Sequence, residues 1–152
     1  MIASKAPDII MDLIKKEYHI KGEGPPEYYL GKDYKTYKVQ YAIGCKKYIK
    51  EAVRIVQYQE KVKMKRQSVP ASPGDQPELD TLEFLDDDGH IYYQMLVGMF
   101  NWTVGICRLD IAHATSSLAL FAFCPRKVRL KCALRVFGYL KKYPNKRIVV
   151  DS

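Results

Sequence analysis

Hydrophobic residues recur at helical spacing along much of this chain. Apolar positions three or four residues apart form one face of an α-helix. This pattern predicts helices over residues 8–19, 46–59, 93–104, 110–120 and 125–143. The last of these carries basic residues between its apolar ones, so we expect an amphipathic, basic helix.

Acidic residues stand where two of these helices begin. Asp86, Asp87 and Asp88 precede the helix of residues 93–104, and Asp110 precedes the next. Carboxylates favour the positive end of the helix dipole, so acidic N-caps are expected. Three adjacent aspartates could also suggest a metal site, but their side chains would diverge and no further ligands follow at loop spacing.

Aromatic and β-branched residues predict a β-hairpin between the first two helices. Two strand-like segments, residues 27–34 and 37–43, flank Lys35 and Thr36. Gly31 lies inside the first segment, where a glycine indicates a bulge or a close approach of another backbone.

Residues 61–88 read as a linker, because they are rich in proline and then in acids. This linker separates a mixed part, residues 1–60, from a helical part, residues 89–145. The predicted fold class is α+β, with a helix and a β-hairpin followed by a mostly helical subdomain.

Charge is strongly polarised along the chain, whose formal net charge is +8. Residues 75–88 contain seven acids and no lysine or arginine, whereas residues 125–150 contain nine lysines or arginines and no acid. A basic surface of this kind favours a polyanionic partner. The alternative is a solvated helix face that only aids solubility.

Several classes of protein find no support in the sequence. No apolar run is long enough to span a bilayer, and the first residues lack the apolar core of a signal peptide. The four cysteines are irregularly spaced, so reduced and mostly buried thiols are expected instead of a zinc site. No nucleotide-binding loop, metalloprotease motif or nucleophile elbow occurs, and the three histidines are too scattered to propose a triad. We expect neither a membrane nor a small-molecule substrate as partner.

Six short segments follow one another in an order that is hard to obtain by chance. They are residues 2–5, 20–31, 43–49, 93–102, 108–112 and 133–141. Together they resemble the reverse transcriptase region of copia-type LTR retrotransposon polyproteins, over nearly the whole chain. Two departures are Leu109, where the family usually has proline, and Arg129–Leu130, near where it often has His-Trp.

The resemblance implies a piece of a polymerase without its catalytic centre. In that family an apolar stretch like residues 2–5 directly follows the Tyr-x-Asp-Asp strand, so the catalytic aspartates and their two magnesium ions would lie upstream of Met1. No catalytic residue, metal ligand or cofactor is therefore expected in this chain, and it should be inactive alone. Residues 146–152 would begin a link toward a ribonuclease H domain.

The resemblance also assigns nucleic-acid contacts. Residues 1–60 would be the end of the palm and the first thumb helix, with Leu30 and Gly31 in the primer grip. Asn101 and Trp102 would lie on the thumb helix that tracks the template–primer minor groove, although Trp102 could equally be a core residue. Side chains of the last helix would contact phosphates: Arg126, Lys127, Arg129, Lys131, Arg135, Lys141 and Lys142.

The leading hypothesis is therefore a fragment of an RNA-directed DNA polymerase that contributes template–primer binding. Its partners would be an RNA or DNA template–primer and the rest of the polyprotein, in a cytoplasmic virus-like particle or in the nucleus. The alternative is a relic with no independent activity, in which the apolar faces of residues 9–14 and 28–30 lack their partners. No constellation of side chains favours an independent enzyme.

Overall fold

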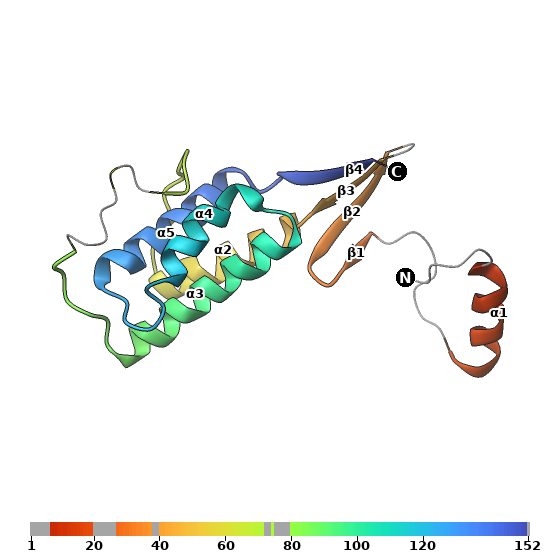
Figure 1. The fold of residues 1–152 in the computed structure, drawn as a ribbon, viewed down its shortest axis with the longest axis horizontal. Coiled ribbons are helices and arrows are strands. Elements are labelled where there is room, and N and C mark those ends of the chain that lie inside the picture. Colours follow the sequence, from red (N-terminus) through yellow and green to blue (C-terminus); the bar gives the residue numbers. More distant parts are fainter. Residues whose placement is uncertain (1–6, 20–26, 38–39, 72–73, 75–79, 152) are drawn as a thin grey trace.

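A computed structural model describes residues 7–19, 27–37, 40–71, 74 and 80–151 of the chain. In this part of the protein, helices combine with a four-stranded antiparallel sheet (Figure 1), as the α+β prediction required. The helices are α1 (Pro7–Glu17), α2 (Lys46–Glu60), α3 (Asp87–Ile106), the 3-10 turn η2 (Leu109–Ile111), α4 (Ala112–Ala119) and α5 (Lys127–Lys142). The strands are β1 (Tyr28–Tyr29), β2 (Lys32–Tyr37), β3 (Gln40–Gly44) and β4 (Arg147–Asp151).

The sheet joins residues 28–44 to the C-terminal end of the described chain. Its strand order is β1-β2-β3-β4, and β4 pairs with β3 from Gln40 opposite Asp151 to Gly44 opposite Arg147. Ile148, with the valines that follow it, suits a strand because β-branched side chains pack well on a pleated surface. The segment predicted to link toward another domain is therefore a strand of this sheet.

The predicted hairpin turn was wrong. Lys35 and Thr36 lie inside β2, and the connection from β2 to β3 falls at residues 38–39, outside the described residues. The described turn joins β1 to β2 at Leu30 and Gly31, between the paired residues Tyr29 and Lys32. Gly31 is thus a turn residue and not a bulge.

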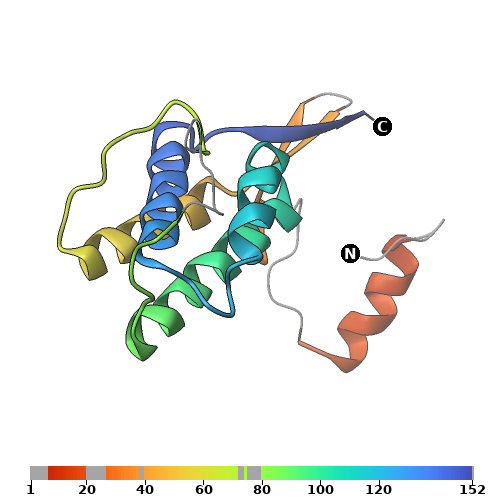
Figure 2. The ribbon, with the colours of Figure 1, turned by 60° about the vertical axis from the view of Figure 1, so that its left-hand side comes forward.

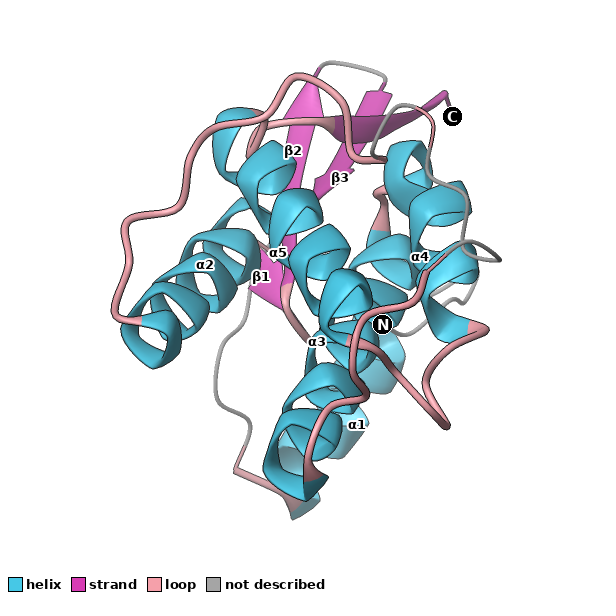
Figure 3. Cartoon of the chain, turned by 90° about the vertical axis from the view of Figure 1, so that its left-hand side faces the viewer, coloured by secondary structure: helices cyan, strands magenta, loops and turns pink. Residues whose placement is uncertain are grey.

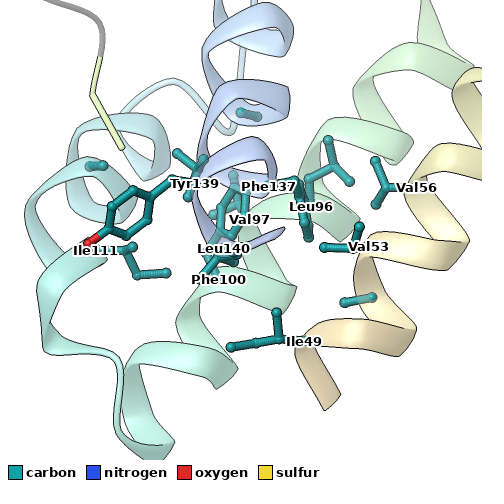
Figure 4. Packing of buried hydrophobic residues seen from close by; sticks show 14 of the residues in the cluster. Ile49, Val53, Val56, Leu96, Val97, Phe100, Ile111, Phe137, Tyr139 and Leu140 are labelled. Atoms are coloured by element: carbon teal, nitrogen blue, oxygen red, sulfur yellow. The ribbon is translucent and has the colours of Figure 1, made fainter. Parts of the chain in front are cut away.

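One hydrophobic core lies between α2, α3, α4 and α5 (Figure 4). The rings of Phe100 and Phe137 are 4.6 Å apart between centroids at its centre. Ile49, Val53 and Val56 of α2 belong to the same core. Helix α2, which the sequence placed in the first part of the chain, therefore packs with the helices that follow the linker, so the linker does not divide the core.

The two predicted acidic caps had different outcomes. Asp86 caps α3, because its Oδ1 accepts a hydrogen bond of 2.9 Å from the Gly89 N–H. Asp110 does not cap α4; it lies within η2 and receives two hydrogen bonds from the buried Arg108 guanidinium. The prediction failed there because a nearby buried cation binds that carboxylate more favourably than the helix end does.

Helix α1 stands apart from the helical bundle (Figure 2). On its predicted apolar face, Ile9 and Leu13 are exposed. Tyr29 of β1 and Leu30 of the following turn are exposed as well. These side chains are uncovered in the described part of the structure.

Candidate nucleic-acid interface

Two predicted site segments that are far apart in the sequence lie together in the structure. A Cβ atom built on Gly31 would lie 3.2 Å from Nε1 of Trp102 and 3.6 Å from Cδ1 of Ile106. The turn between β1 and β2 therefore lies directly against the C-terminal half of α3. The glycine predicted the close approach of another backbone, but the neighbour here is the side chain of Trp102.

The turn holds a non-glycine residue in a left-handed conformation. Leu30 has φ +47° and Gly31 has φ +77°, and both central residues of a two-residue type I′ hairpin turn require positive φ. Asparagine or glycine usually takes the first position, because a larger residue there costs about 1–2 kcal/mol. The Leu30 side chain is 61% exposed, so its burial cannot offset this strain. Backbone strain that no buried contact offsets is concentrated at functional sites, so it points to a functional role for Leu30.

The outer face of α3 is unusually open on both sides of Trp102. Helical spacing aligns Met95, Gly98, Trp102 and Gly105 on one stripe. A Cβ built on Gly98 or Gly105 would meet nothing within 4 Å, and the Trp102 side chain is 48% exposed. Trp102 is therefore not a core residue. The adjoining Asn101 is exposed and can offer both hydrogen-bond donors and an acceptor. We call Asn101, Trp102 and these two glycines the α3 stripe.

Aromatic and cationic groups flank the turn. The ammonium group of Lys47 lies 4.7 Å from the centre of the Tyr28 ring. The backbone N–H of Lys47 donates to Asp33 Oδ2 at 3.2 Å, which ties the start of α2 to strand β2. Exposed aromatic faces beside a cation are groups that nucleic-acid-binding surfaces use. Sequence reasoning missed Lys47 and Tyr28, because their proximity depends on the sheet packing against α2.

The basic side chains at the start of α5 contact the linker. Lys127 forms an ion pair of 2.5 Å with Glu83, and the Arg126 guanidinium stacks 4.0 Å from the centre of the Phe84 ring. Arg129 is 2% exposed, and its Nε lies 3.7 Å from Asp80 Oδ2. The expectation that Arg129 contacts phosphates was therefore wrong, because this side chain is buried against an acid of the linker.

Further along α5 the pattern continues, and residues 61–71, which follow α2, run beside this helix (Figure 3). Arg135 Nε donates to the Ala71 carbonyl at 3.2 Å, and Lys142 Nζ donates to Ser68 Oγ at 2.8 Å. Lys131 is exposed and lines a groove between the loop and the helix. Lys131 thus remains available for a phosphate contact at the surface of α5.

Two further observations bear on the chemistry. Within the described ranges, no cluster of three or more His, Cys, Asp or Glu side chains could hold a metal ion, and no helix is both long and apolar enough to cross a membrane. Cys45 and Cys107 are buried free thiols with their Sγ atoms 3.4 Å apart, whereas Cys124 is exposed. The expectation of buried thiols therefore holds for this pair and fails for Cys124.

We also compared the chain with known proteins. No protein family, curated protein or solved structure matches the chain.

Proposed function

We propose that this chain binds a nucleic-acid duplex without reading its sequence, as the template–primer-binding part of a retrotransposon polymerase whose catalytic residues lie elsewhere. The duplex backbone would cross the Leu30–Gly31 turn and the α3 stripe. The chain's partners would be an RNA or DNA template–primer and the remainder of the polyprotein.

One observation carries the proposal: the contact between Gly31 and Trp102. The resemblance assigned the turn and the helix separately to the same duplex, and their proximity lets one stretch of duplex contact both. The open backbone at Gly98 and Gly105 supports it further, because a helix without side chains at these positions lets a sugar–phosphate strand approach closely.

The chain provides its own probe for a test. Trp102 is the single tryptophan in the sequence, so its fluorescence reports on this site alone. Titration with an RNA–DNA hybrid or a DNA duplex should quench the emission equally for unrelated base sequences. The affinity should fall steeply with salt, because each neutralised phosphate releases counterions.

Variants separate binding from folding. Leu30→Gly relieves the positive-φ strain, so the protein should keep or slightly raise its unfolding midpoint while duplex affinity falls about three- to tenfold. Asn101→Ala should weaken binding to a similar extent, measured with a labelled duplex. Tyr58→Ala removes an exposed aromatic side chain of α2 outside the site and serves as the control.

Absence of quenching even at low salt, in a protein that unfolds cooperatively, would rule out this function. If the purified chain aggregates or melts without a cooperative transition, the relic alternative gains support. The exposed apolar side chains Ile9 and Leu13 are the observation that favours this alternative.

A further inference from the structure

A groove of about 600 Å³ lies between residues 60–67 and the first half of α5. Val62, Met64, Val128 and Leu134 contribute apolar surface to it. Its volume falls within the range of about 300–1,000 Å³ that is usual for ligand sites. The duplex path proposed above does not cross this groove, although Lys131 and Arg135 in its lining were predicted phosphate contacts.

The wall of the groove is fixed in place. The Gln67 N–H donates to the Gly138 carbonyl at 3.2 Å, and Lys141 Nζ donates to the Met64 carbonyl at 3.1 Å. A Cβ atom on residue 138 would lie 2.4 Å from the Lys65 carbonyl oxygen, so only glycine lets the loop lie this close to α5. A preformed binding site loses less conformational entropy when a ligand binds.

Positive charge surrounds the apolar floor. Lys63, Lys65, Lys131 and Arg135 line the groove, and Glu60 supplies the single carboxylate among its described lining residues. Desolvation lowers the pKa of the Lys141 ammonium behind the wall, and the charges of Lys63 and Arg66 lower it further. The cations around the groove therefore repel one another, and an anionic occupant would relieve this repulsion.

The lining chemistry distinguishes between two anionic occupants. The described lining residues include no aromatic ring on which a base could stack. A charged phosphate backbone also gains little from contact with apolar side chains. The neighbouring turn of α5 already holds an acidic and apolar segment of this same chain: Glu83 pairs with Lys127, and Phe84 stacks on Arg126. An extended peptide with alternating acidic and apolar side chains matches both features of the groove.

We propose that this groove is a docking site for an extended, acidic segment of a partner protein, which places apolar side chains on Val62, Val128 and Leu134 and carboxylates against the surrounding lysines. This site is separate from the duplex interface at Trp102, and its test does not depend on duplex binding.

The experiment measures fluorescence polarisation of a short labelled peptide of alternating glutamate and leucine with the full chain at low salt. Saturable binding is expected. Lys63→Glu should weaken it about five- to tenfold, because the change replaces an attraction with a repulsion at a partly screened surface. Val62→Ser should weaken it to a similar extent through lost apolar contact, and Val62 is 64% exposed, so folding should not suffer.

Matched controls make the result decisive. Lys16→Glu, on α1, changes the net charge by the same amount as Lys63→Glu and should leave peptide binding unaltered. An all-glutamate peptide should bind much more weakly than the alternating one. Equal binding of the two peptides, no effect of Val62→Ser, or displacement of the peptide by a DNA duplex would each overturn the proposal, the last by making the groove a nucleic-acid site.

Discussion

Replacing Asp110 with asparagine tests how a buried arginine is tolerated in this fold. The Arg108 side chain is fully buried. Its Nε and Nη2 donate to the two Asp110 carboxylate oxygens at 2.8 and 3.0 Å, and its Nη1 donates to the Tyr143 carbonyl at 2.9 Å. Tyr139 also donates to Asp110, at 2.7 Å. Asp110→Asn removes the charge and keeps the shape.

The expected cost is about 3 kcal/mol. Removing one partner of a buried ion pair typically costs about 3–5 kcal/mol, because the remaining charge is left without compensation. The lower end applies here for two reasons. Asparagine keeps one acceptor oxygen, and the Asp110 side chain is 24% exposed, so water can reach it. In a domain of this size, such a loss lowers the melting temperature by about 6–12 °C.

The pH dependence follows from the same contacts. Burial alone would raise the pKa of Asp110, but the hydrogen bonds from Arg108 and Tyr139 outweigh it and hold that pKa well below its usual range. The stabilisation is therefore complete above the unfolded-state pKa of about 4 and is lost as the pH falls toward the folded-state pKa. Asp110→Asn should remove this part of the acid sensitivity.

Urea unfolding followed by far-ultraviolet circular dichroism, at neutral pH and at several acidic pH values, measures both effects. Asp12→Asn on the exposed face of α1 removes the same charge and should change stability by no more than about 0.5 kcal/mol. The reasoning is refuted if Asp110→Asn has the same urea midpoint and slope as the original protein, or if it keeps the full loss of stability in acid.

Three further substitutions test the packing. Gly31→Ala should cost about 1–2 kcal/mol in urea unfolding, because alanine is strained at φ +77° and its Cβ would press on Trp102, whose emission should shift. Tyr93→Phe should cost about 1 kcal/mol in the same assay, since the buried Tyr93 hydroxyl donates to the Leu118 carbonyl at 2.8 Å; an unchanged midpoint would contradict this. Phe137→Ala should cost about 3–5 kcal/mol by leaving a cavity in the core, and calorimetry should show a much lower melting temperature.

Local sequence patterns determined most helices of this protein. Helix α2 begins at Lys46 as predicted and ends within one residue of the expected position, and Asp86 caps α3. Such features depend on neighbours three or four residues away, so a single sequence carries them. The prediction failed at the hairpin, because Leu30–Gly31 lacks the asparagine or aspartate that usually marks a two-residue turn.

The candidate sites depended on contacts that no local pattern contains. The sequence by itself provided the basic residues of α5, the proposal that Asn101 and Trp102 contact a duplex, and the glycine at position 31. Only the tertiary structure decided that Arg129 is buried against Asp80 and that Gly31 lies on Trp102. Helical and strand periods fix which face of an element is apolar, whereas the pairing of distant faces depends on how the whole core closes.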